Sequence, residues 1–96
     1  MAPGKGTCPL CSVGYQQYKT QQLTAYRYKN HEVRLTIHSG SAGLAVNGSP
    51  VSGLSCTSYS NVRSCTFVAT SNGTFNAIVY GAPGPATYSL EYFWDD

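Results

Sequence analysis

The segment CTSYSNVRSC, from Cys56 to Cys65, continues into the strand-like CTFVA that ends at Ala69. Two cysteines enclose eight mostly small and polar residues, and the second cysteine opens a run of alternating apolar side chains. In a short chain with the composition of an exported protein, this spacing predicts a disulfide that closes a surface loop and attaches it to a strand. Closing a loop of about ten residues stabilises a fold by roughly 2–3 kcal/mol in the chain-entropy treatment. Half of a zinc site and two free thiols are the alternatives.

The composition limits the size and the class of the protein. The chain has 96 residues, enough for one domain with a small core, and only 10% of the residues are charged. Serine, threonine, glycine and tyrosine are abundant, which favours a small extracellular β domain over a cytosolic enzyme. Four basic residues, Lys19, Arg27, Lys29 and Arg34, are too dispersed for a nucleic-acid-binding stripe, and no apolar run approaches the roughly 20 residues that span a bilayer. We therefore expect a secreted protein with no nucleic-acid partner and no membrane span.

The first part of the chain, residues 1–14, contains glycine and proline and predicts a tail or linker before a single domain over 15–96. Its marked feature is CPLC, from Cys8 to Cys11. A redox motif of this type needs a preceding strand and a following helix, and neither is expected here. A structural disulfide between Cys8 and Cys11 is therefore favoured, with a redox motif and half of a zinc site as alternatives. Residues 1–6 lack the apolar region of a signal peptide, so we expect a mature or excised part of an exported protein.

Alternating apolar residues predict short strands along the rest of the chain, and no helical period appears. The clearest strand has Val33, Leu35 and Ile37 on its buried face. An earlier strand over 23–28 is expected to join it through a turn at Asn30-His31. About seven short strands, separated by turns every eight to twelve residues, predict an all-β fold: a small antiparallel β-sandwich or barrel. The turns are expected at Ser39-Gly40-Ser41, Asn47-Gly48-Ser49-Pro50, Ser71-Asn72-Gly73 and Gly81-Ala82-Pro83-Gly84-Pro85.

Four segments carry a resemblance to a known family: VRLTIHSGSAGLAVN from Val33, the cysteine-bracketed loop, TFVATSNGTFNAIVYG from Thr66 and ATYSLEY from Ala86. In this order they resemble the bacterial pre-peptidase C-terminal domain over about residues 21–92. That domain is a small jelly-roll-like β-sandwich found behind the catalytic domains of secreted metalloproteases, collagenases and some serine proteases. Tyr88 and Leu90 stand where the family has its final Y-x-L strand.

The chain departs from this family where some relatives bind calcium. Ser41-Ala42-Gly43-Leu44-Ala45 stands in place of their acidic run, and the whole chain has four carboxylate side chains, Glu32, Glu91, Asp95 and Asp96. Calcium takes about six to eight oxygen ligands, commonly with several carboxylates. We therefore expect no calcium site, and no other metal or cofactor is indicated.

Catalytic groups are scarce in this sequence. His31 and His38 are the imidazoles of the chain, and aspartate occurs only at its last two positions, so a Ser-His-Asp triad would need the extreme C-terminus in a pocket. No two carboxylates share a strand face as glycoside hydrolysis requires. We expect His31 in a turn, His38 on the solvent face of its strand, and no enzymatic activity.

The twelve aromatic residues, eight of them tyrosines, exceed what a core of this size needs. In the strand over 23–28, Tyr26 and Tyr28 alternate with apolar residues and are expected to face solvent. If this strand pairs with the one that follows, Arg34 lies on the same face. Flat aromatic side chains suit sugar rings or proline-rich collagen strands. A core position for the tyrosines is the alternative. The predicted binding residues are Tyr26, Tyr28, Arg34, Tyr59 in the disulfide loop, and Tyr80.

The resemblance and the composition together indicate a function without catalysis. We expect an accessory domain of a secreted bacterial hydrolase, with a protease catalytic domain as its partner. Such a domain would bind insoluble protein, such as collagen, or polysaccharide substrate, or would assist secretion. The alternative is a free-standing secreted protein that acts by protein–protein contact, such as a toxin, an inhibitor or an adhesion factor.

Overall fold

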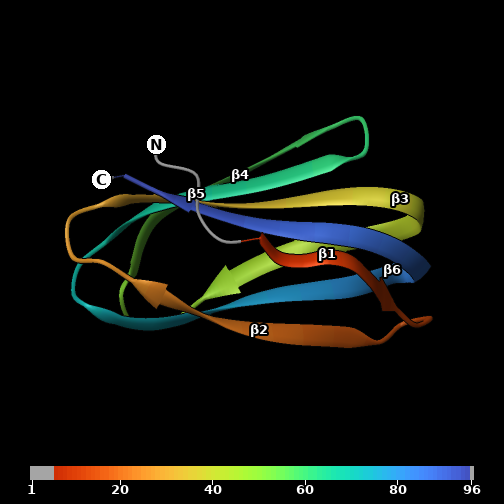
Figure 1. Ribbon diagram of the computed structural model, residues 1–96, viewed down its shortest axis with the longest axis horizontal. Helices are drawn as coiled ribbons and strands as arrows, with labels where there is room; N and C mark the ends of the chain where they lie inside the picture. The colour runs from red at the N-terminus through yellow and green to blue at the C-terminus, as the bar shows by residue number, and fades with distance from the viewer. Residues whose placement is uncertain (1–5, 96) are drawn as a thin grey trace.

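Two long bent strands organise the fold. In this computed structural model, which describes residues 6–95, β3 covers Asn30–Asn47 and β6 covers Gly73–Trp94. The two strands pair antiparallel over almost their full lengths, and they bend together where the register shifts between Ile37 and Ala42. Because both strands continue through the bend, each contributes one half to each of two layers (Figure 1).

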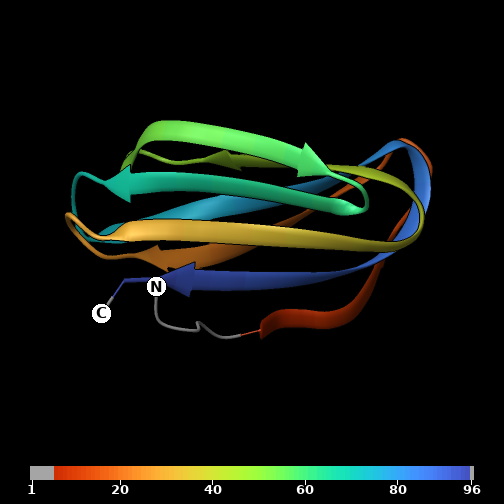
Figure 2. The same ribbon diagram turned by 90° about the horizontal axis from the view of Figure 1, so that it is seen from above.

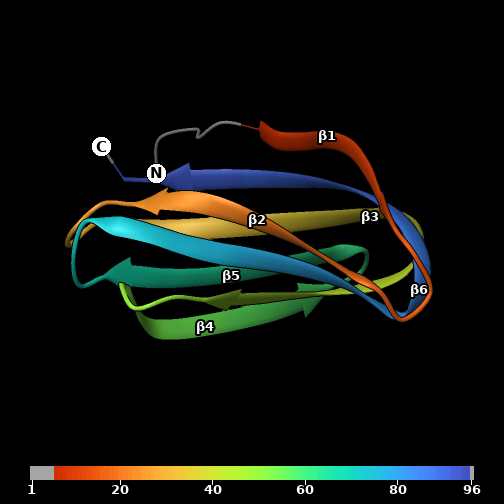
Figure 3. The same ribbon diagram turned by 90° about the horizontal axis from the view of Figure 1, so that it is seen from below.

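Four further strands extend the two layers. They are β1 (Gly6–Val13), β2 (Tyr18–Ala25), β4 (Val51–Tyr59) and β5 (Val62–Ala69). The larger layer has the strand order β1-β6-β3-β5-β4, and β2 pairs with the first half of β6 in the smaller layer. Figures 2 and 3 show β1 and β4 at opposite edges of the larger layer. All of these pairings are antiparallel, so the predicted fold class, a small antiparallel β-sandwich, is confirmed.

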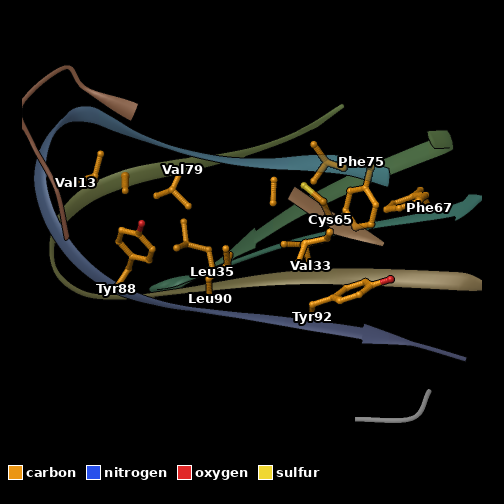
Figure 4. Packing of buried hydrophobic residues seen from close by; sticks show 14 of the residues in the cluster. Val13, Val33, Leu35, Cys65, Phe67, Phe75, Val79, Tyr88, Leu90 and Tyr92 are labelled. Atoms are coloured by element: carbon orange, nitrogen blue, oxygen red, sulfur yellow. The ribbon is translucent and has the colours of Figure 1, made fainter. Parts of the chain in front are cut away.

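The core lies between the two layers and follows the alternation of the strands. Val33, Leu35 and Ile37 are buried, as predicted, and Phe75 of the smaller layer packs in the same cluster (Figure 4). Burying one such side chain contributes about 1.5–3 kcal/mol to folding. Trp94 is partly buried at the edge of the cluster. The other buried residues of the cluster are Val13, Leu23, Ala25, Ala42, Val46, Cys65, Phe67, Ala69, Ala77, Val79, Ala86, Tyr88, Leu90 and Tyr92.

Both predicted disulfides are present. Cys56 and Cys65 lie directly opposite each other on β4 and β5, with Cα atoms 4.1 Å apart. Cys8 and Cys11 are bonded within β1. Cys65 is buried in the core, whereas Cys56 is exposed. The enclosed segment is a β-hairpin that continues both strands, rather than an irregular surface loop, and the bond fastens the edge strand β4 to the core.

Two segments predicted as turns are bends inside strands. Ser39-Gly40-Ser41 lies within β3, and Gly81–Pro85 lies within β6. Gly40 has a φ of 80°, and a β-carbon on it would overlap the Pro85 carbonyl, so only glycine fits this position. The sequence shows the bend-forming residues but not that each strand resumes in the same ladder. About seven short strands were therefore predicted where residues 6–95 form six.

The N-terminal segment differs from its prediction as a tail or linker. Gly6–Val13 forms β1 and pairs with the second half of β6. Cys8 and Cys11 pack against the core from this strand. The register shifts on both sides of Cys8 break the regular alternation, which explains why the strand was not recognised in the sequence. The part of the predicted tail over residues 1–5 lies outside the described residues.

Candidate functional site

The five predicted binding residues lie at four separate places in the fold. Tyr26 and Tyr28 lie at the turn between β2 and β3, and Arg34 lies on the outer face of the larger layer. Tyr59 ends β4, and Tyr80 lies on the outer face of the smaller layer. The predicted hairpin that would bring Tyr26, Tyr28 and Arg34 to one face is wrong, because β2 pairs with β6 and not with β3. Alternation in a sequence reveals a buried face but not which strand lies beside it.

His31 organises the turn between β2 and β3. It was predicted to lie in a turn at Asn30-His31, but it belongs to β3 and is fully buried. Its Nε2 accepts a hydrogen bond from the backbone N–H of Tyr26 at 3.0 Å, and its Nδ1 lies 2.9 Å from the carbonyl oxygen of Lys29. Its ring stacks on Phe67 with the centroids 4.9 Å apart. The imidazole therefore connects the two ends of the turn.

The protonation state of His31 follows from these contacts. Burial away from water lowers the pKa of His31 below its ordinary value of 6.5, against smaller opposing effects of the Lys29 carbonyl and the Asp95 charge. The neutral tautomer that donates from Nδ1 and accepts at Nε2 satisfies both hydrogen bonds. Because both nitrogens are engaged, this imidazole holds a backbone turn and is not available as a base or a metal ligand. His38 is exposed, as predicted.

Arg27 and Tyr28 are exposed to solvent on this turn, and hydrogen bonds fix the backbone that carries them. Tyr28 is 70% exposed and has a φ of 64°, a conformation that costs a residue other than glycine about 1–3 kcal/mol. Hydrogen bonds from the Tyr28 N–H to the Ala69 carbonyl and from the Arg27 N–H to Asn72 Oδ1 maintain it. The Arg27 guanidinium lies 4.5 Å from the centroid of the Tyr28 ring and donates to its hydroxyl at 2.6 Å. These two side chains form one exposed aromatic and cationic unit.

Tyr26 is held against the body of the sandwich instead. Its ring lies parallel to that of His31, with the centroids 6.2 Å apart, and 5.5 Å from the ring of Trp94. Trp94 in turn contacts Tyr92, whose hydroxyl donates to the Thr24 carbonyl. Tyr26 therefore combines packing with partial exposure, whereas Tyr28 is the surface residue of the pair.

Arg34 already has partners within the fold. Its guanidinium forms an ion pair with Glu32 at 3.0 Å and lies 4.7 Å from the centroid of the Phe93 ring. Glu32 also accepts a hydrogen bond from the Ser64 hydroxyl at 2.8 Å. On the outer face of the larger layer, the side chain of Arg34 thus contacts β6 directly and is connected to β5 through Glu32. Its predicted role in binding stays a prediction.

The outer face of the smaller layer gathers Tyr80 with a tyrosine that the sequence reasoning missed. Tyr18 of β2 is the register partner of Tyr80 on β6, and Gly43 of β3 is the partner of Tyr80 on the other side. Tyr18 is 72% and Tyr80 41% exposed. We call this outer face the tyrosine face. It comprises Tyr18, Thr20, Gln22 and Thr24 of β2, Thr74, Asn76, Ile78 and Tyr80 of β6, and Gly43, Ala45 and Asn47 of β3.

Gly43 determines how the Tyr80 ring lies. A β-carbon built on Gly43 would overlap the end of the Tyr80 ring, which shows that the ring extends across the neighbouring strand at this position. Directly opposed residues in an antiparallel pair have β-carbons about 4.5–5.5 Å apart, so Tyr18 and Tyr80 start side by side on neighbouring strands. From there the Tyr80 ring extends to the side away from β2, over Gly43 of β3. The missing side chain at position 43 thus lets an aromatic ring cover the end of the sheet.

Next to the tyrosines, the tyrosine face carries only neutral polar and apolar side chains, and no charged one. Gln22, Asn76 and Asn47 form one row across the three strands. Asn76 Nδ2 lies 3.5 Å from Asn47 Oδ1, and Gln22 Nε2 lies 3.4 Å from the Thr74 hydroxyl, so these groups hold one another loosely. Side-chain amides offer both donors and acceptors to a ligand. The face therefore combines an aromatic end with an uncharged hydrogen-bonding end.

Tyr18 was missed because the strand that carries it begins earlier than predicted. The stretch over 18–22 has no apolar member on its inner face, so its alternation is invisible in the sequence. The repeated pattern of Thr20, Gln22 and Thr24 with Tyr18 was the signal that could have revealed an outward face.

The described residues contain no cluster of side chains typical of metal binding. Within residues 6–95, no group of three or more His, Cys, Asp or Glu side chains could hold a metal ion. The four cysteines are consumed by the two disulfides. In the same part of the chain, no helix is long and apolar enough to cross a membrane.

Comparison with known proteins adds no assignment. No protein-family model, no curated protein and no solved structure matches this chain. The resemblance to the pre-peptidase C-terminal domain stays a prediction, supported by the sequence segments that suggested it.

Proposed function

We propose that this protein is a non-catalytic, secreted binding module that attaches a partner, such as a bacterial hydrolase, to insoluble polysaccharide or protein. The observation that carries the proposal is the tyrosine face. Two register-paired tyrosines, Tyr18 and Tyr80, lie beside rows of neutral amide and hydroxyl groups on a sheet. Aromatic rings bury much area with little loss of side-chain entropy, and adjacent amides bind hydroxyl or peptide groups. An uncharged face fits a polymer that is itself uncharged.

Adsorption of single variants to insoluble matrices tests this proposal. The chain is incubated with chitin, cellulose or collagen particles, and the bound fraction is measured over a range of particle concentrations. Loss of an aromatic anchor commonly costs 1 kcal/mol or more, so Tyr18→Ala and Tyr80→Ala should each weaken adsorption by about fivefold or more. The variant Leu10→Ala is the control, because Leu10 is a 72% exposed large apolar residue on β1 of the other layer.

The variant Gly43→Val separates the position of the Tyr80 ring from its presence. Valine at position 43 displaces the ring while leaving both tyrosines in place, so adsorption should fall although no aromatic residue is lost. Thr36→Val, on the half of β3 that lies in the larger layer, is its control. Undiminished adsorption of a Tyr18→Ala/Tyr80→Ala double variant, with an unchanged melting temperature, would refute the proposal.

The alternative function, a free-standing protein that acts by protein–protein contact, is favoured by the β2–β3 turn. Tyrosine and arginine are the residues that most often dominate protein interfaces, and Arg27 and Tyr28 form an exposed pair on a well-held turn. If Tyr28→Ala, and not Tyr18→Ala, reduces adsorption to collagen, contact through the turn replaces contact through the tyrosine face.

A further inference from the structure

The outer edge of the larger layer is formed by β4, and this edge is open. β4 is the terminal strand in the order β1-β6-β3-β5-β4, and within residues 6–95 it pairs only with β5. All of its residues except Val51 are exposed. Figure 3 shows β4 at the border of the sandwich with no strand beyond it. An exposed strand edge presents backbone N–H and C=O groups that can pair with another strand.

The spacing of β4 and β5 shows which backbone groups point outward. Directly opposed residues in an antiparallel pair have Cα atoms about 5.5 Å apart when they exchange hydrogen bonds and about 4.5 Å apart when they do not. The Cα atoms of Cys56 and Cys65 are 4.1 Å apart, so this pair is of the second kind. The N–H and C=O groups of Cys56, and of Ser58 two residues later, therefore point away from β5 toward the free edge.

The two edges of the larger layer are protected unequally against pairing. β1 contains Pro9, which lacks an N–H, and its ladder shifts register on both sides of Cys8. The stretch from Val51 to Asn61 contains no proline and no charged residue. A register shift between Ser52 and Ser55 interrupts the first part of β4, which leaves Ser55–Tyr59 as the regular part of the edge.

We propose that two copies of this chain pair antiparallel through Ser55–Tyr59 of β4, about a twofold axis at Thr57. This register places Cys56 of each copy opposite Ser58 of the other, so the outward backbone groups of both residues exchange hydrogen bonds. Thr57 then lies opposite the same threonine of the second copy. A second copy fits this edge because two uncharged strands meet without like-charge repulsion.

The same register gives Tyr59 a neighbour. Tyr59 is 83% exposed in the single chain, and the twofold axis places the small residue Ser55 of the second copy directly opposite it. A large aromatic ring over a small residue fills the outer surface of the joined layers at two symmetric points. Tyr59, the most exposed of the large hydrophobic side chains in residues 6–95, thereby becomes partly buried.

If the tyrosine face binds an insoluble matrix, as proposed above, the pairing also affects how strongly the protein adsorbs. Directly opposed residues in an antiparallel pair point to the same face, so the two larger layers join edge to edge with both smaller layers on one side. The two tyrosine faces then point the same way, apart from the twist of the sheet, and can contact one insoluble surface. Two linked sites can raise overall affinity by about 100-fold to 10,000-fold over one.

Sedimentation equilibrium of the full chain, without polymer, tests the pairing independently of adsorption. The wild-type chain should show a concentration-dependent dimer. Ser58→Pro removes one outward N–H and should raise the dimer dissociation constant by at least about tenfold, whereas Ser58→Ala keeps the N–H and should leave it unchanged. Circular dichroism of each variant establishes that the strands are intact.

A second pair of variants covers the case in which Ser58→Pro does not fold. Thr57→Lys places two like charges at the twofold axis and should abolish the dimer. Thr66→Lys adds the same charge to the exposed outer face of β5, away from the edge, and should not. A wild-type chain that sediments as a monomer up to about 1 mM, or dimers that persist in Thr57→Lys, would overturn the proposal. A wild-type chain that forms the dimer but adsorbs to none of the matrices would refute the proposed function alone.

Discussion

Mild acid should destabilise this protein through His31. Because burial holds the pKa of His31 below 6.5 in the folded state, the unfolded chain binds a proton at a higher pH than the folded chain does. The free energy of unfolding therefore falls as the pH drops below about 6.5, and it continues to fall until the folded-state pKa is reached. In that window the loss is at most about 1.4 kcal/mol per pH unit. For a domain of this size, 1 kcal/mol corresponds to about 4–8 °C in melting temperature.

Besides the burial of the charge, protonation of His31 removes a hydrogen bond from the N–H of Tyr26. Protonated His31 carries a hydrogen on Nε2, so this nitrogen can no longer accept a hydrogen bond from the Tyr26 N–H. The turn between β2 and β3 then keeps only the hydrogen bond between Nδ1 and the Lys29 carbonyl as its contact of this kind with the ring. The other ionisable side chain that acts on His31 is Asp95, whose pKa is lowered by its hydrogen bond with Asn30. A lowered carboxyl pKa removes stability only below about pH 4, so the two windows are separate.

Urea unfolding between pH 7.5 and 5.0 measures the effect. Wild type should lose stability below pH 6.5, whereas His31→Gln, whose amide does not titrate, should be less stable at pH 7.5 but nearly independent of pH in this range. His38→Gln is the matched control, because His38 is exposed further along β3, and it should follow the wild type. A wild-type slope that survives in His31→Gln, or disappears in His38→Gln, would refute the reasoning.

Three further predictions concern stability. Replacing Cys56 and Cys65 together with alanine should cost about 2–3 kcal/mol in urea unfolding, and non-reducing mass mapping of the wild type should show the two cysteines in one linked peptide pair. Phe75→Ala should cost about 3–5 kcal/mol because Phe75 is fully buried between the layers, whereas Tyr59→Ala should change the stability of the single chain by less than about 0.5 kcal/mol. Millimolar calcium should leave the melting temperature unchanged, because Ser41–Ala45 carries no carboxylate; a rise of several degrees over a chelator control would reveal a site that this reasoning missed.

The sequence by itself determined the class of the fold and both disulfide partners. Alternation at Val33, Leu35 and Ile37 identified a buried strand face, since the side-chain period of a strand is two whatever lies beside it. The short spacing of Cys56 and Cys65 favoured pairing with each other, because a local loop closes easily. These features depend on residues close together in the chain, and local physical chemistry is sufficient to predict them.

Only the tertiary structure decided which strands are neighbours and which residues share a surface. Tyr18 and Tyr80 are 62 positions apart in the chain and become register partners because β2 pairs with β6. His31 was predicted to lie in a turn, but β3 already begins at Asn30. His31 is buried because its ring stacks with the rings of Phe67 and Tyr92, which belong to the neighbouring strands β5 and β6. Strand pairing is set by the burial of whole faces against one another, and that free energy exists only once distant segments have met.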